Sequence, residues 1–205
     1  MKELEMMSSP FSKGYWRNAI KEFSSLKNVV LIGLLIALQV VVGLLYIPVT
    51  AEVRIKFDFI VSSLIGMIFG PLVGMVSGAI SDVLSFVIHP TGPFFIGYTL
   101  TSALAGFIYG IFFYRTKIKF WKLIAAKLIV NMVCNAFLGT LWYYIYMSKD
   151  LVFEALITSF WIRFTKNIVL LPLEVMVIYT IFKQLFLVLE TKKLIVLQDP
   201  AMKWF

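Results

Sequence analysis

The chain has 205 residues, of which 60% are apolar and only 15% are charged, and its formal net charge is +8. Soluble domains carry about 25% charged residues, so this composition excludes an ordinary soluble domain and favours an integral membrane protein. One cysteine, Cys134, and one histidine, His89, also exclude a disulfide framework and a Cys/His zinc site, and no cofactor is expected.

Six apolar stretches follow one another along the chain and predict membrane-spanning helices. Gly70-Pro71 divides the longest run into two short spans, because proline disfavours a helical residue before it and can begin a new helix. The expected spans are residues 28–47, 55–70, 71–88, 94–114, 122–147 and 160–189. We therefore predict an all-α integral membrane fold with six transmembrane helices. This domain, residues 28–189, lies between an N-terminal segment (1–27) and a C-terminal tail (190–205).

The distribution of charge predicts the orientation of these helices. Loops on the side of both termini carry the whole net charge of +8, and the opposite loops carry none. Basic residues concentrate in cytoplasmic loops, so both termini are expected in the cytoplasm. The same rule explains the basic excess without a nucleic-acid partner.

Ionisable residues inside the predicted spans are the first candidates for function, because a charge at bilayer depth costs about 2.5–3.5 kcal/mol and usually pairs or faces a cavity. They are Asp58, Asp82, Lys127, Arg163, Lys166 and Glu174. Three are acidic and three are basic, so complete internal pairing is one explanation.

The last span carries the most informative polar pattern. Arg163, Lys166, Asn167 and Glu174 lie within roughly 60° of one another on a helix. Arg163 and Lys166 lie near the outer end, where they could bind an incoming anion. Glu174 lies deeper and could pair with Lys127.

Two further sets of polar residues repeat at i, i+4 and i+8: Lys127, Asn131 and Asn135, and Arg54, Asp58 and Ser62. Asn131 and Asn135 could either hold helices together or contact a ligand. Arg54 and Asp58 could form an ion pair within one helix.

A stripe of small residues, Gly70, Gly74 and Gly78, leads to Asp82. Small residues at this spacing allow helices to approach closely. We therefore expect the glycines to pack against another helix and Asp82 to accept hydrogen bonds that hold the fold.

Aromatic residues gather at the outer face, after the loop of residues 89–93. Phe94, Phe95 and Tyr98, together with His89 and with Trp161 on the last span, could stack a flat heteroaromatic ligand. Anchoring among membrane lipid headgroups is the alternative for any one of them.

The chain lacks the motifs of nucleotide binding and hydrolysis. No G-x-x-x-x-G-K-[ST], H-E-x-x-H or G-x-S-x-G sequence occurs. The chain is therefore not expected to bind ATP through a P-loop or to act as an enzyme. A small membrane enzyme acting on lipid through Asp58 or Asp82, and an assembly protein whose charges only pair internally, are the rival functions.

Three segments resemble a known family. Residues 69–82 resemble the signature G-P-x-x-G-x-x-x-G-x-x-x-D of substrate-binding S components of energy-coupling factor (ECF) vitamin transporters. Residues 89–100, and residues 163–167 with 171–174, resemble the folate-specific branch. The similarity extends from about Lys27 to Leu189.

This resemblance implies the ECF S-component fold and a plasma-membrane protein that captures folate from outside. Folate would bind to the aromatic residues, to Asn131, Asn135 and Asn167, and to Arg163 and Lys166. Another flat vitamin, thiamine or riboflavin, is the alternative substrate. The resemblance also implies docking on one transmembrane coupling protein and two ATPase subunits. Gly33 and Ala37 occupy the spacing of the docking motif A-x-x-x-A, with glycine in place of the first alanine.

Overall fold

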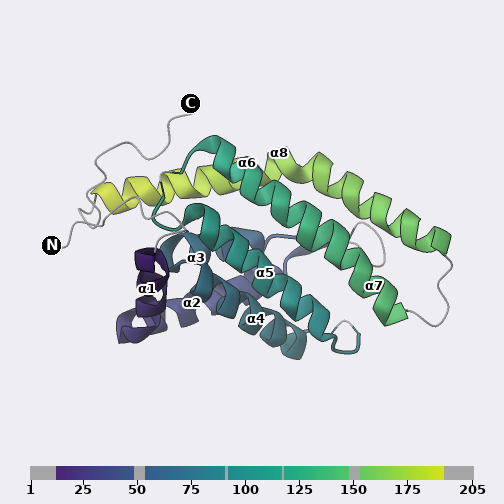
Figure 1. Ribbon diagram of the computed structural model, residues 1–205, viewed down its shortest axis with the longest axis horizontal. Helices are drawn as coiled ribbons and strands as arrows, with labels where there is room; N and C mark the ends of the chain where they lie inside the picture. The colour runs from purple at the N-terminus through teal and green to yellow at the C-terminus, as the bar shows by residue number, and fades with distance from the viewer. Residues whose placement is uncertain (1–12, 49–53, 91, 117, 148–152, 192–205) are drawn as a thin grey trace.

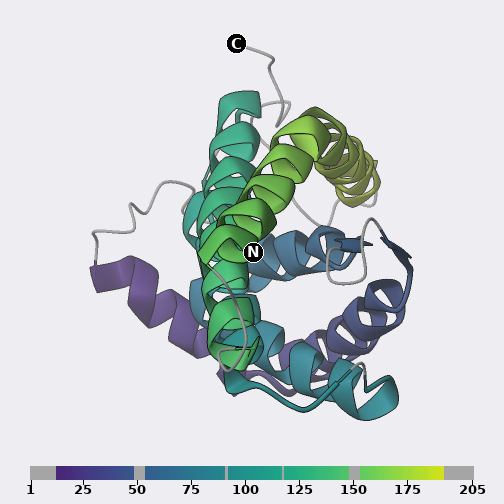
Figure 2. The same ribbon diagram turned by 90° about the vertical axis from the view of Figure 1, so that its right-hand side faces the viewer.

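The structure, a computed structural model, describes residues 13–48, 54–90, 92–116, 118–147 and 153–191. Its one pair of strands in that part of the chain is antiparallel, β1 (Tyr46–Pro48) with β2 (Arg54–Lys56). The helical elements are α1 (Lys13–Lys21), a 3-10 turn (Glu22–Ser24), α2 (Leu26–Gly43), α3 (Phe59–Phe69), α4 (Pro71–Ile88), α5 (Ile96–Phe113), α6 (Phe120–Ile129), the π-helix η2 (Val130–Leu138), α7 (Gly139–Met147) and α8 (Phe153–Thr191). Figure 1 shows α6 and α7 as one continuous rod, with α2, α3, α4 and α5 packed together below it. The rod lies beside α8 in both views (Figures 1 and 2).

Five helical segments are long and apolar enough to cross a membrane: Leu26–Gly43, Pro71–Ile88, Ile96–Phe113, Phe120–Ile145 and Leu156–Leu185. The predicted membrane-spanning helical fold is thereby confirmed for the described residues. The remaining predicted span corresponds to α3, which is apolar but has 11 residues. At 1.5 Å per residue α3 is about 16 Å long, against about 30 Å of hydrocarbon. The count of six spans and the cytoplasmic position of both termini stay predictions.

The break at Gly70-Pro71 is confirmed. Gly70 ends α3 and precedes Pro71, the first residue of α4. The φ angle of Gly70 is 90°, in the left-handed region that side chains other than glycine rarely adopt. A Cβ at this position would also lie 3.1 Å from the ring of Tyr114. Glycine is therefore required here by both backbone conformation and space.

The predicted helical spacing of Arg54, Asp58 and Ser62 is wrong. Arg54 lies in β2, and α3 begins only at Phe59, with Asp58 as its N-cap residue. The reason is that residues 46–48 and 54–56 pair as antiparallel strands, here called the hairpin, with Ile47 opposite Ile55. The Arg54 guanidinium lies over the ring of Tyr46, 4.7 Å from its centroid. An ion pair of Arg54 with Asp58 within one helix is therefore excluded.

Helices α4 and α5 approach each other through the predicted stripe of small residues. A Cβ built on Gly74 would collide with the backbone oxygen of Gly106, and one on Gly78 would collide with the backbone oxygen of Ser102. Asp82, further along the same helix, accepts hydrogen bonds from Thr99 (2.7 Å) and Ser102 (3.3 Å). The packing role expected for the glycines and for Asp82 agrees with these contacts.

Replacing Gly74 by alanine should therefore destabilise the protein by about 1–3 kcal/mol, because the added methyl group overpacks a contact made by backbone atoms. Gly33→Ala on α2 is the matched control, since a Cβ there meets no atom within 4 Å. The control should be neutral or stabilising by up to about 1 kcal/mol. Thermal unfolding of both variants in detergent measures the difference, and equal stability would contradict the close approach.

A short helix that the sequence did not predict, α1, closes one end of the bundle. The buried Tyr15 donates a hydrogen bond to the backbone oxygen of Gly110 (3.0 Å), and burial raises the pKa of its hydroxyl. Glu22 then accepts hydrogen bonds from Tyr114 (2.9 Å) and Asn28 (2.8 Å). Tyr15 and Glu22 thus fix this part of the chain to the ends of α5 and α2.

Candidate functional site

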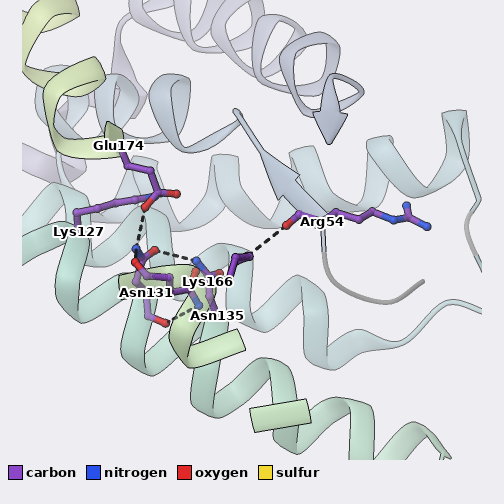
Figure 3. A network of polar contacts seen from close by, with 7 residues as sticks. Arg54, Lys127, Asn131, Asn135, Lys166 and Glu174 are labelled. Atoms are coloured by element: carbon purple, nitrogen blue, oxygen red, sulfur yellow. Dashed lines mark hydrogen bonds and ion pairs between the residues drawn. The ribbon is translucent and has the colours of Figure 1, made fainter. Parts of the chain in front are cut away.

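A buried polar network joins α6 and η2 to α8 (Figure 3). The Nζ of Lys127 lies 3.3 Å from the Oε1 of Glu174. The amide of Asn131 donates to the Oε2 of Glu174 (2.8 Å) and to the backbone oxygen of Asn167 (3.2 Å). All four residues are buried. The predicted pairing of Glu174 with Lys127 is therefore confirmed, and Asn131 bridges the two helices.

The network extends along the π-helix η2. Asn135 donates from its amide to the Oδ1 of Asn131 (3.0 Å) and is only partly buried. Asn167 donates in return to the backbone oxygen of Asn131, at 3.4 Å. Three amide side chains from two helices thus lie together, and that of Asn135 is the least buried of the three.

Lys166 links α8 to the strand hairpin. Its Nζ donates to the backbone oxygen of Arg54 in β2 (3.2 Å), as Figure 3 shows. Of the charges around it, that of Glu174 attracts it, and those of Arg163 and Lys127 repel it. Lys166 therefore faces the hairpin, whereas Asn167, the next residue, faces η2.

Arg163 lies against α7. Its Nη1 is 3.3 Å from the point that a Cβ on Gly139 would occupy, and its guanidinium carbon is 5.8 Å from the ring centroid of Tyr143. Its Nε is buried without an acceptor among the described residues. A buried guanidinium nitrogen without an acceptor is costly, so an anion at this position would be stabilised.

The charges inside the membrane segments are thus unequal in their partners. Lys127 pairs with Glu174, and Asp82 accepts from two hydroxyl groups. Among the described residues, neither Arg163 nor Lys166 has a carboxylate within 4.0 Å. Arg163 and Lys166 are therefore the two cations of the described site that no carboxylate contacts.

An aromatic group lies between α5 and α7. Phe95 packs on Tyr98 and on Trp142, with centroid distances of 5.9 and 5.8 Å. The indole nitrogen of Trp142 donates to the Oγ1 of Thr101 (2.8 Å). The structure therefore brings together two of the predicted aromatic residues and adds Trp142, which sequence reasoning missed. The sequence feature that could have identified Trp142 was its position inside a predicted span, where an indole N–H needs a hydrogen-bond partner.

Three predicted site residues lie apart from these groups. His89 and Phe94 are exposed, and Phe94 packs on Phe86 at 5.2 Å. Trp161 is 55% exposed, and its ring packs on Phe160 and Phe164 of its own helix. A role for these three residues in ligand binding stays a prediction.

Comparison with known proteins identifies the relatives of this chain. Residues 27–182 match the family model described as ECF transporter, substrate-specific component. Proteins named folate transporter FolT are similar: that of Clostridium novyi is 34% identical over 65% of this chain and 75% of its own length. That of Streptococcus mutans is 32% identical over 82% of this chain and 91% of its own length.

A solved structure is similar as well. The crystal structure of FolT bound with folic acid superposes with a TM-score of 0.71 at 34% sequence identity. The similarity covers 79% of this chain and 98% of that one.

Proposed function

The chain belongs to the substrate-specific (S) components of ECF transporters, and from this membership we propose that it captures folate outside the cell and delivers it to an ATP-driven module. Members of this family are multi-pass proteins of the plasma membrane and are transport subunits, not enzymes. The rival function of a lipid-modifying enzyme is thereby set aside.

The observation that carries the proposal is the pair of cations at the site that no carboxylate contacts among the described residues. Arg163, with a buried Nε that lacks an acceptor, and Lys166 lie on one helix. Folate ends in a glutamate with two carboxylates, so a bound folate would balance both cations. A guanidinium can hold a carboxylate by two parallel hydrogen bonds, and an ammonium adds a point charge.

The rest of the site supports the flat part of the same ligand. A pterin presents ring nitrogens, an amino group and an oxo group at its edge, and the amides of Asn131, Asn135 and Asn167 can donate to or accept from such groups. Phe95 and Tyr98, with Trp142, offer faces on which an aromatic ring can stack. The charge balance also separates the alternatives, because thiamine is a cation and riboflavin lacks carboxylates.

The test is direct binding of folate, thiamine and riboflavin to the purified protein in detergent, with mass spectrometry of any small molecule that copurifies. We expect one folate per chain and no competition from thiamine or riboflavin. Binding of another vitamin without folate would replace this proposal by the alternative substrate.

We further propose that the exposed face of α2 docks on the transmembrane coupling protein, which would act with two ATPase subunits. The chain has no P-loop of its own. Gly33 and Ala37 both lie on the exposed side of α2, and the space beside Gly33 is open. Small residues on an exposed helix face permit close approach of a partner helix.

Replacing Gly33 by tryptophan should abolish assembly with the coupling module while folate binding stays within about threefold of the parent, because the bulky ring would hold the partner helix away. Copurification with the module and transport into vesicles measure the first effect, and folate titration measures the second. Gly14→Trp on α1, an equally open glycine, is the control and should assemble normally. Normal assembly of the Gly33 variant would contradict docking through this face.

A further inference from the structure

A π-helix divides the rod formed by α6 and α7. Phe120 to Met147 run through α6, η2 and α7, and the nine residues Val130–Leu138 in the middle are π-helical. π-helices are rare, usually occupy one turn, and occur frequently at functional sites. The segment contains neither proline nor glycine, so no helix-breaking residue accounts for it.

The two sides of η2 belong to different parts of the site. Before and within its first turn, Lys127 and Asn131 face Glu174 on α8. After it, Gly139 lies at the Arg163 guanidinium, and Trp142 reaches Thr101 on α5.

A π turn takes about one residue more than the 3.6 residues of an α turn. Removal of that extra residue would close the turn as an ordinary α turn and leave the residues after η2 facing as before. If η2 became α-helical without that removal, or if it gained a further residue, everything after it would rotate by about 100° relative to α6. The rotation would carry Gly139 away from Arg163 and Trp142 away from Thr101, while Lys127 would keep its partner.

Gly139 shows why this rotation matters. A Cβ at Gly139 would lie 3.3 Å from the Nη1 of Arg163, which is closer than most contacts of a Cβ atom. Any other residue of α7 turned into this position would bring a larger side chain. The guanidinium therefore keeps its present position only when Gly139 occupies this register.

We infer that the π-helix η2 is a positioning element of the binding site, which sets the register of α7 so that Gly139 and Trp142 complete the half of the site around Arg163. This inference rests on the proposed binding of folate. The exposed residues of η2, Val133 and Phe137, affect ligand binding only through the register of α7.

The test deletes Phe137, whose side chain is 60% exposed, near the end of η2. Its matched control is the full-length variant Phe137→Leu/Leu138→Ala, which has the same local sequence with one more residue, alanine. The opposite change inserts alanine between Leu138 and Gly139, which turns α7 by about 100°. We expect folate affinity to stay within threefold in the control and in the deletion, where the remaining residues close as an α-helix with α7 in its parent register. The affinity should fall at least tenfold in the insertion. Parent-like affinity of the insertion, or a tenfold loss in the deletion, would overturn the inference.

A ligand-independent readout separates this inference from the proposed function. Thr101→Cys and Trp142→Cys, in a Cys134→Ser background, should be joined by a short bismaleimide in the parent register, in the deletion and in the full-length control, but not in the insertion. If the parent failed to bind folate, the proposed function would fail, and the cross-link would still decide the register. Cross-linking in the insertion would refute the rotation.

A second variant tests the inference if the variants with altered chain length do not fold. Gly139→Val keeps the chain length and should lower folate affinity at least tenfold, because the side chain displaces the Arg163 guanidinium. Leu141→Val, on the same turn and partly exposed, should bind folate within threefold of the parent. Unchanged affinity of the Gly139 variant would refute the role assigned to its register.

Discussion

Replacing Arg163 by alanine should weaken folate binding by about 10- to 100-fold. Hydrogen bonds to charged groups contribute about 1.5–3 kcal/mol each, and every 1.4 kcal/mol is a factor of ten in affinity. The guanidinium already lies against α7 with its Nε lacking an acceptor, so little rearrangement is needed to receive a carboxylate. Isothermal titration of folate into the detergent-solubilised protein measures the change.

The control for Arg163 is Lys183→Ala, which removes a cation from an exposed position of the same helix, α8. That variant should bind folate as the parent does. Arg163→Lys should fall between the two, because an ammonium keeps the charge but loses the two parallel hydrogen bonds. Equal losses in the Arg163 and Lys183 variants would show that only net charge matters and would contradict a specific site at Arg163.

The Lys166 side chain should contribute less than that of Arg163. Its Nζ already donates to the backbone oxygen of Arg54, so binding a carboxylate competes with an existing hydrogen bond. The two cations on α8 are therefore unequal in their expected contribution to folate binding. The sequence could not show this difference, because spacing along a helix gives the face on which a residue lies and not its partner on another element.

The membrane-spanning fold was predictable because apolar length and helix breakers are properties of the local sequence. The runs before Pro48 and around Gly70-Pro71 predicted α2, α3 and α4 within a few residues. The hairpin of β1 and β2 was missed, since each strand has only three residues and no alternation can be read over so short a segment. Helix α1 was missed because its docking depends on Tyr15 meeting α5, a contact distant in sequence.

The polar site was predictable in part for the same reason. Helical spacing predicted that Arg163, Lys166, Asn167 and Glu174 lie on one side of α8, and the structure places them toward η2, α7 and the hairpin. The π-helical register of η2 could not be predicted, because a change of hydrogen-bond partner from i−4 to i−5 requires no particular residue. That change determines which residues of α7 meet Arg163.

Breaking the buried pair of Lys127 and Glu174 should have the largest effect on stability. Lys127→Met leaves a carboxylate without its cation inside the protein, and removing one partner of a buried pair costs about 3–5 kcal/mol. The loss should lie near the lower limit, because Asn131 still donates to Glu174. The midpoint of thermal unfolding in detergent, measured without ligand, reports this change.

The double variant Lys127→Met/Glu174→Leu decides whether the pair itself or the packing around it is responsible. Replacing a buried ion pair by apolar residues of similar size is often neutral or stabilising, and Asn131 keeps the backbone oxygen of Asn167 as an acceptor. The double variant should therefore recover most of the stability lost in the single one. Because Lys127 and Glu174 pair with each other and, among the described residues, neither forms an ion pair with Arg163, the recovered protein should also bind folate. Additive losses in the double variant would show that the two charges do not compensate each other, and Lys127 and Glu174 would then have to be considered as ligand-binding residues in their own right.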